Sequence, residues 1–244
     1  MRTLLVLLFG LPSTAIFAVA AVAGGLFRAR RGYFDWVHRN WGRIMLGLAG
    51  VGVEVEGMER LKPDTALILA ANHQSWFDIV AVFASLPVSL RFVAKKEISR
   101  IPLFAQAIRS AGHVYVDRQN RAQAVAAMRD AGVRMREQGL SMALFPEGTR
   151  SPDGRLLPFK KGSFVLAIET GNTLLPVAID GGRLIMPKGR IGIHSGRIRI
   201  RCGEPIPLAG LTKDDRDAVL DATEGQISEM LAEIRVAPLP PGSE

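Results

Sequence analysis

The chain has 244 residues, enough for one sizeable domain with a complete core and too few for two ordinary domains joined by a linker. Hydrophobic residues make up 48% of it and charged residues 22%, a balance that excludes an intrinsically disordered protein. The formal net charge of +8 implies an anionic partner, and the usual choices are nucleic acid and an anionic membrane surface.

The N-terminal segment decides between these two partners. Thr3–Phe27 carries no charge over twenty-five residues, and Arg28, Arg30 and Arg31 follow directly. A helix of this length is long enough to span a hydrocarbon layer of about 30 Å. Residues Trp36–Leu48 add a second apolar segment with two tryptophans at interfacial depth. This context favours a membrane partner and no nucleic acid.

Three interpretations of the apolar N-terminal run stay open. It is a signal peptide cleaved after residues 18–20 or 21–23, an anchor that spans the bilayer, or part of a helix pair that lies half in the bilayer. Pro12 would kink or divide the helix. We expect residues 1–50 to form a retained, membrane-associated helical segment. The arginines that follow the run then place the protein at the cytoplasmic face of the cell inner membrane.

From residue 65 onward, short apolar runs alternate with helical stretches. This alternation predicts an α/β fold over residues 51–236, with a mostly parallel sheet flanked by helices, and a flexible tail at 237–244. Residues 190–201 alternate Arg and Ile and predict a hairpin with one solvent-exposed face. Strands are expected at 66–70, 91–94, 113–116, 142–145 and 174–179, and helices at 77–86, 100–110, 120–138, 162–170 and 212–235.

A histidine and an aspartate follow the first of these strands. A neutral imidazole takes a proton from a hydroxyl group, and a carboxylate on its other ring nitrogen fixes the tautomer. Residues five apart lie about 140° apart around a helix axis, so His73 and Asp78 cannot pair on a straight helix. They pair if His73 lies in the turn and Asp78 in the first helical turn. A purely structural interpretation also stays open, because Ser75 and Asp78 resemble a capping box.

A second polar turn follows the strand at 142–145. It offers a glycine for close backbone approach, a hydroxyl donor and a guanidinium that can bind phosphate through two hydrogen bonds, in the run Glu147, Gly148, Thr149 and Arg150. Since carboxyl ends of parallel strands gather at one edge of a sheet, we expect an anion site there. Lys95 and Arg118 end two other strands and can face the same cleft. The alternative is an ordinary surface turn with solvated charges.

Metal chemistry has no visible ligand set in the sequence. The single cysteine, Cys202, excludes an internal disulfide and a multi-cysteine zinc site. The four histidines are scattered and form no H-E-x-x-H pair. No G-x-S-x-G nucleophile elbow occurs either, so a direct transfer to the acceptor's own hydroxyl is favoured over a serine nucleophile.

With these pieces placed, the sequence resembles the glycerolipid acyltransferase family, and specifically its bacterial 1-acylglycerol-3-phosphate acyltransferases. Four blocks occur in the family's order over about residues 65 to 180. Residues 72–78 match the N-H-x-x-x-x-D motif, and residues 112–118, 145–151 and 175–179 look like the second, third and fourth blocks. His113 stands where an aliphatic residue would be expected, a departure within the second block.

The resemblance implies that His73 is the general base and Asp78 its orienting partner. It also implies that Arg118, Glu147, Gly148 and Arg150 help to bind the glycerol phosphate of lysophosphatidic acid, and that Lys95 is a further phosphate contact. The acyl donor would be acyl-CoA or acyl carrier protein, with no metal and no other cofactor. The implied product is phosphatidic acid.

Rival functions share part of this evidence. The same chemistry could act on a lyso-ornithine lipid or on glycerol 3-phosphate. A non-catalytic protein could instead hold anionic lipid with the basic turns, but pure lipid binding has no use for a carboxylate paired with a histidine.

Overall fold

We describe the protein from a computed structural model. It describes residues 1–62, 65–117 and 120–236, apart from the side chains of Lys95, Ile98, Arg121 and Val236. The tail expected at 237–244 therefore lies outside the described residues.

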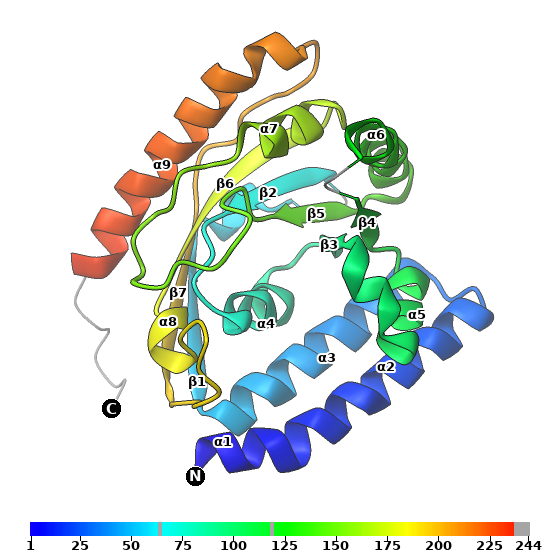
Figure 1. The fold of residues 1–244 in the computed structure, drawn as a ribbon, viewed down its shortest axis with the longest axis vertical. Coiled ribbons are helices and arrows are strands. Elements are labelled where there is room, and N and C mark those ends of the chain that lie inside the picture. Colours follow the sequence, from blue (N-terminus) through cyan, green and yellow to red (C-terminus); the bar gives the residue numbers. More distant parts are fainter. Residues whose placement is uncertain (63–64, 118–119, 237–244) are drawn as a thin grey trace.

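In this part of the chain the strands form one sheet of seven strands, with the spatial order β1-β7-β6-β2-β5-β3-β4 (Figure 1). Every neighbouring pair is parallel except β6 and β7, which are antiparallel. The predicted α/β class with a mostly parallel sheet is confirmed. The strands are β1 (Val51–Glu56), β2 (Leu67–Ala71), β3 (Leu90–Lys95), β4 (Val114–Val116), β5 (Ser141–Leu144), β6 (Thr173–Asp180) and β7 (Gly196–Cys202).

The predicted helices are present within a few residues of their expected bounds. The α-helices are α1 (Arg2–Leu5), α2 (Leu11–Leu26), α3 (Arg31–Ala49), α4 (Trp76–Ser85), α5 (Pro102–Ser110), α6 (Arg121–Gln138), α7 (Lys161–Ile168), α8 (Gly182–Ile185) and α9 (Arg216–Val236). Val6–Gly10 forms a π-helical turn, and short 3₁₀ turns cover Met58–Arg60, Lys96–Arg100 and Lys213–Asp215.

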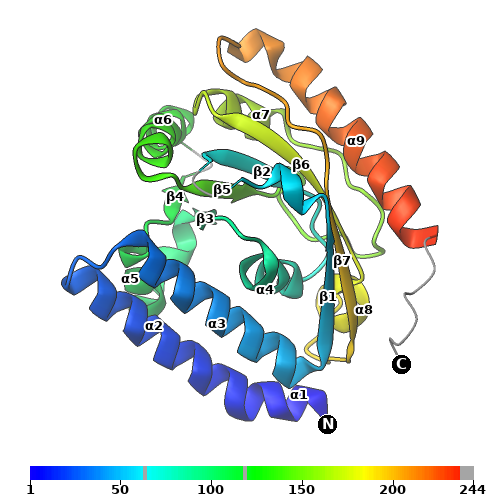
Figure 2. The same cartoon turned by 180° about the vertical axis from the view of Figure 1, so that it is seen from behind.

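Helices cover both faces of the sheet, as Figures 1 and 2 show from opposite sides. Helices α3, α4 and α8 pack in one buried apolar cluster, and α6, α7 and α9 pack in the other. The two clusters share β2, whose residues alternate between them: Leu67, Leu69 and Ala71 face α4, while Ile68 and Ala70 face the opposite layer. Because both faces of β2 are buried, its sequence is a continuous apolar run.

The hairpin predicted at 190–201 is wrong. Only Gly196–Cys202 forms a strand, β7, which pairs in parallel with β1 and antiparallel with β6. The alternation itself is real, because Ile198 and Ile200 are buried while Arg199 forms an ion pair with Glu54 of β1. A period of two gives a strand and its faces but does not identify its neighbour. The sequence prediction missed β1, the strand that β7 pairs with.

The N-terminal region forms a pair of helices that packs on the same side of the sheet as α4. The chain passes from α1 through the π-helical turn into α2, and the 25-residue helical run Arg2–Leu26 is apolar and long enough to cross a membrane. Pro12 lies at the start of α2. Proline has no backbone N–H to donate, and this gap in the helical hydrogen bonds lies next to the π-helical turn. Helix α3 packs tightly on α4: a Cβ on Gly42 would lie 3.0 Å from the carbonyl oxygen of Val80.

A glycine in α6 tests how tightly the second layer is packed. A Cβ at Gly132 would lie 2.6 Å from both Cα and the carbonyl oxygen of Thr170, whereas nothing lies within 4 Å at Gly225 in α9. Gly225→Ala should raise stability by up to about 1 kcal/mol through helix propensity. Gly132→Ala should lower it by about 1–3 kcal/mol, because backbone must move. Thermal unfolding of both variants measures this, and equal Tm shifts would contradict the close approach.

Candidate active site

The candidate site begins where β2 ends. The Asn72 side chain continues the sheet ladder: its Nδ2 donates to the carbonyl oxygen of Ile179 at 2.8 Å, and its Oδ1 accepts from the N–H of Ile179 at 2.7 Å. The backbone of residues 72–75 is thereby released from the sheet to form a turn while β6 keeps its hydrogen bonds. Sequence reasoning did not assign this role to Asn72.

Asp78 organises this turn through one carboxylate oxygen. Its Oδ2 accepts from the backbone N–H of Gln74 at 2.6 Å and of Ser75 at 2.8 Å, and it lies 2.9 Å from Nδ1 of His73. The structure thus brings His73 and Asp78 together, with His73 in the turn and Asp78 in the first turn of α4. The capping box with Ser75 is also present, so the helix cap and the contact with His73 share the same carboxylate.

The pair is shielded from solvent on one side only. Asp78 is fully buried, whereas the His73 side chain keeps 12% of its surface exposed. The imidazole stacks on Phe145, with ring centroids 4.1 Å apart. Because Nδ1 faces Asp78, the other ring nitrogen, Nε2, is the one that can accept a proton from a bound molecule.

Glu147 lies beneath the histidine turn, from the loop after β5. Its Oε1 accepts from the N–H of His73 at 2.7 Å, and its Oε2 accepts from the N–H of Leu157 at 3.3 Å. Burial raises the pKa of Glu147 to about 7, although these two hydrogen bonds act in the opposite direction. The N–H of Ser151 donates to the carbonyl oxygen of His73 at 2.7 Å. In this geometry Glu147 holds the two loops together.

The other residues of the second polar turn lie closer to the surface. Gly148 has φ +68°, and a Cβ there would lie 2.7 Å from Nζ of Lys160, so this turn favours glycine. Thr149 accepts a hydrogen bond from Nζ of Lys188 at 3.0 Å. The guanidinium of Arg150 lies over the ring of Trp76, 5.2 Å from its centroid. Lys188, which the sequence analysis missed, thus joins the basic groups around this turn.

Two predicted phosphate contacts have no described side chain. Lys95 ends β3, the neighbour of β5, but its side chain is outside the described part of the structure. Arg118 lies outside the described residues altogether. Asp117, its neighbour after the edge strand β4, pairs with Lys96 at 3.0 Å.

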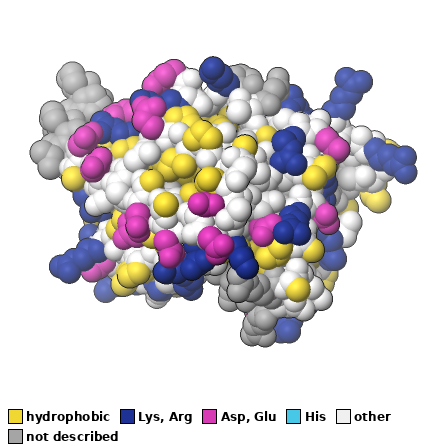
Figure 3. Space-filling model, turned by 90° about the horizontal axis from the view of Figure 1, so that it is seen from above, with side chains coloured by type: hydrophobic (Ala, Val, Ile, Leu, Met, Phe, Trp, Pro, Cys, Tyr) yellow, Lys and Arg dark blue, Asp and Glu magenta, His cyan; other side chains and the backbone are white. Residues whose placement is uncertain are grey.

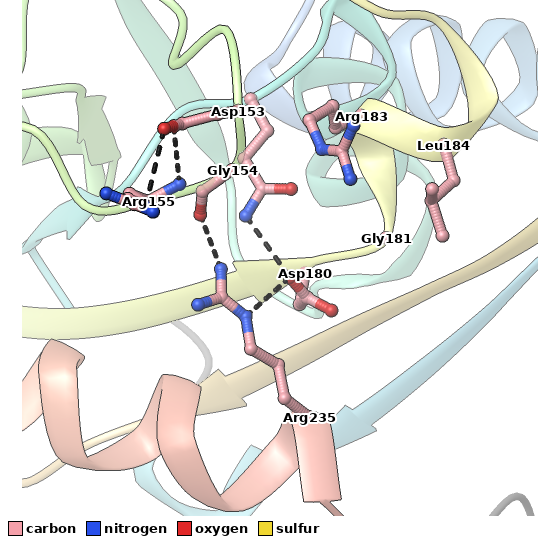
Figure 4. A pocket seen from close by; sticks show the side chains of 9 residues that line it. Asp153, Gly154, Arg155, Asp180, Gly181, Arg183, Leu184 and Arg235 are labelled. Carbon is pink, nitrogen blue, oxygen red and sulfur yellow. Dashed lines mark hydrogen bonds and ion pairs between the residues drawn. The ribbon is translucent and has the colours of Figure 1, made fainter.

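Two further features hold the His73 turn in place. A Cβ on Gly182, at the start of α8, would collide with Oδ1 of Asp78, so only glycine leaves room for the buried carboxylate. Beside Gln74 lies a cavity of about 210 Å³ (Figure 4). There Asp180 Oδ1 accepts from Arg235 of α9 at 3.1 Å and from Gln74 at 3.3 Å. Helix α9 is thereby tied to the turn that carries His73.

The buried thiol of Cys202 lies away from this site and is not a second reactive centre. Burial raises the pKa of the Cys202 thiol to about 12, so it is not a nucleophile at neutral pH. Among the described residues, no group of three or more His, Cys, Asp or Glu side chains could hold a metal ion.

Several known proteins that are similar to this chain are acyltransferases. The family model "Acyltransferase" matches residues 52–180. A 1-acyl-sn-glycerol-3-phosphate acyltransferase of Limnanthes alba is 36% identical over 176 residues, covering 72% of this chain and 62% of that protein. The human 1-acyl-sn-glycerol-3-phosphate acyltransferase alpha is 30% identical over 187 residues, covering 77% and 66%. The chain thus spans slightly less than two thirds of these two relatives.

A solved structure is similar over nearly the whole chain. The crystal structure of the 1-acyl-sn-glycerophosphate (LPA) acyltransferase PlsC from Thermotoga maritima has a TM-score of 0.77 and 29% identity, and the match covers 98% of this chain and 100% of that one. The family match spans more than half of the chain and includes both the His73 turn and the Glu147 loop. This protein therefore belongs to the acyltransferase family.

Proposed function

We propose that the protein transfers a fatty acyl group from a thioester donor to the free sn-2 hydroxyl of 1-acylglycerol 3-phosphate, giving phosphatidic acid. The observation that carries this proposal is the His73–Asp78 pair, 2.9 Å apart and set at the carboxyl end of β2 in a member of the acyltransferase family. The names of the similar proteins support the choice of acceptor.

The chemistry needs one base and correct positioning. Nε2 of His73 takes the proton of the acceptor hydroxyl as its oxygen attacks the thioester carbonyl carbon. The carbon–sulfur bond then breaks, and the leaving thiolate takes up the proton from Nε2. Asp78 keeps Nδ1 protonated and stabilises the imidazolium formed between these steps. A thioester is already activated, so this mechanism requires no enzyme nucleophile.

The acceptor's phosphate would bind at the second polar turn. Thr149, Arg150, Lys160 and Lys188 supply one hydroxyl and three cationic groups around the backbone of Gly148. The cation–π contact with Trp76 holds the Arg150 guanidinium beside α4, whose N-terminus carries Asp78. Phosphate binding there would place the glycerol hydroxyl near His73, because both loops are joined through Glu147.

Membrane attachment through α1 and α2 would supply the lipid acceptor. The exposed side chains along this helical run are large and apolar, among them Leu4, Leu8, Leu11, Ile16 and Val19. Figure 3 shows the molecule from above the view of Figure 1, the side away from α1 and α2, and there acidic and basic side chains are intermixed with apolar ones. This asymmetry supports docking of the N-terminal helices in the bilayer surface with the charged end in water.

The catalytic pair gives the first activity prediction. His73→Ala should lower kcat by about 10²- to 10⁴-fold, the usual contribution of positioned acid–base catalysis. Asp78→Asn should also lower kcat, because a neutral amide no longer stabilises the imidazolium that forms when His73 takes the proton. It keeps an acceptor oxygen for the turn, so its Tm should change little. Steady-state kinetics with lysophosphatidate, together with thermal unfolding, measure both effects. A folded His73→Ala protein with near-normal turnover would overturn the mechanism.

The second activity prediction concerns recognition of the acceptor's phosphate. Arg150→Ala should lower kcat/KM for lysophosphatidate by roughly 10- to 150-fold, as expected for loss of a charge-assisted contact worth about 1.5–3 kcal/mol. Arg150→Lys should recover only part of this, because an ammonium cannot bind phosphate bidentately. Arg134→Ala on α6 is the matched control and should be silent. An acceptor without phosphate should be used poorly and be indifferent to Arg150. Equal damage with both acceptors would indicate a structural role.

The third prediction of this section concerns whether the N-terminal helices are retained or cleaved. We expect the protein extracted from membranes to retain α1 and α2, because their apolar surface attaches it at the cytoplasmic face, where the proposed acyl donors are made. The basic residues after α2 should add about 1 kcal/mol each on an anionic leaflet, so salt should weaken binding without abolishing it. Intact mass spectrometry gives a direct answer. A chain that begins near Ala21 or Gly24 would identify a cleaved signal peptide.

A further inference from the structure

A second cavity lies next to the amino ends of the parallel strands, whereas His73 lies at their carboxyl ends. It measures about 410 Å³ and is bounded by the first half of α3 and by the loop that leads into β3. This loop includes Ser89, directly before the amino end of β3, whereas His73 follows the carboxyl end of β2. Because β2, β5 and β3 are all parallel, the two sites are at opposite ends of the strands. We refer to this cavity as the α3 pocket.

The α3 pocket carries a surplus of positive charge. Arg39 and Arg43 both line it, four residues apart and so on the same face of the helix. Asp35, the carboxylate in the pocket, is already used: it accepts from Ser89 Oγ and from Nη1 of the buried Arg91 at 2.8 Å. In the described part of the chain no carboxylate pairs with Arg39 or Arg43, and Arg39 reaches only the carbonyl oxygen of Leu86, at 3.5 Å.

The side chain of Trp36 indicates how deep the pocket would lie in a membrane-bound protein. Trp36, which also lines the pocket, is 55% exposed and packs between Phe17 of α2 and Tyr33, with ring centroids 6.1 Å and 6.4 Å away. Tryptophan favours the boundary between hydrocarbon and headgroups. Helices pack about 8–10 Å apart, and an interfacial helix sinks about 5–10 Å into that boundary. Helix α3, behind α2, would therefore lie at headgroup height.

We propose that the α3 pocket binds the phosphate of an anionic membrane phospholipid, at a site separate from that of the acceptor. This inference rests on the membrane attachment of α1 and α2 proposed above. Two guanidinium groups one helical turn apart can each grip phosphate oxygens through paired hydrogen bonds, and neither needs to abandon a carboxylate to do so. The neighbouring Asp35–Arg91 pair is internally neutral and does not repel the ligand.

The test compares two double variants that lose the same charge. Arg39→Gln/Arg43→Gln removes the cations of the pocket, and Arg134→Gln/Lys213→Gln removes two exposed cations from α6 and the turn before α9. Partition is measured on phosphatidylcholine vesicles with and without phosphatidylglycerol. At about 1 kcal/mol per basic residue and 1.4 kcal/mol per tenfold, the pocket variant should bind phosphatidylglycerol vesicles about 30-fold more weakly.

The control should lose less than about threefold, because neither Arg134 nor Lys213 is among the residues that line the pocket. On pure phosphatidylcholine all three proteins should bind alike. The single variant Arg43→Gln, at an exposed position, should show roughly a fivefold loss. It provides the readout if the double variant has a lowered Tm. Equal partition of the pocket variants and the control would overturn the proposal.

Two further arms separate the alternatives. Calorimetric titration with inorganic phosphate, in detergent without lipid, tests the other source of the same chemistry. Binding there that depends on Arg39 and Arg43, with unchanged vesicle partition, would assign the pocket to free phosphate and overturn the lipid assignment. Turnover of a short-chain, soluble lysophosphatidate should be equal in the wild type and both double variants. A wild type without turnover would refute the proposed function but leave the partition result intact.

Discussion

The site depends on the placement of one buried carboxylate oxygen. Oδ2 of Asp78 accepts hydrogen bonds from the backbone N–H groups of Gln74 and Ser75 and faces Nδ1 of His73. The same atom therefore shapes the turn, caps α4 and orients the imidazole. A carboxylate at the N-terminus of a helix is also favoured by the helix dipole. Since Asp78 is fully buried, this position is maintained only while the surrounding elements stay packed, including Gly182 against its other oxygen.

The sheet supplies those surroundings by bringing together segments that are far apart in sequence. β2 lies between β5 and β6, so the His73 turn has the Glu147 loop on one side and the start of α8 on the other. Glu147 and Ser151 join the first of these through the backbone of His73. Gln74 and Asp180 join the second, and Arg235 extends the connection to α9. The position of His73 is thus fixed from both neighbouring strands.

Helix α4 connects this site with the N-terminal helix pair. Its first turn carries Asp78, and its flank packs closely on α3 at Gly42. Because α3 also packs on α2, a bilayer bound at α2 would hold the His73 turn at a fixed height and orientation. The basic α3 pocket opens at the other edge of the sheet, so lipid held there would not compete for the acceptor's position. Membrane binding and catalysis would then use different lipid contacts on one rigid frame.

The sequence by itself determined the α/β class, the approximate bounds of most helices and strands, and the residue types of the site. It could do so because local apolar periodicity, turn residues and the spacing of His73 and Asp78 are properties of short segments. Only the tertiary structure decided which strands are neighbours. It paired β7 with β1 instead of a local hairpin partner, and it placed Glu147 under His73 with its oxygens on backbone donors. It also revealed the roles of Asn72, Gly182 and Lys188. These depend on contacts between distant segments, and a period of two or a single polar residue carries no information about the partner it will meet.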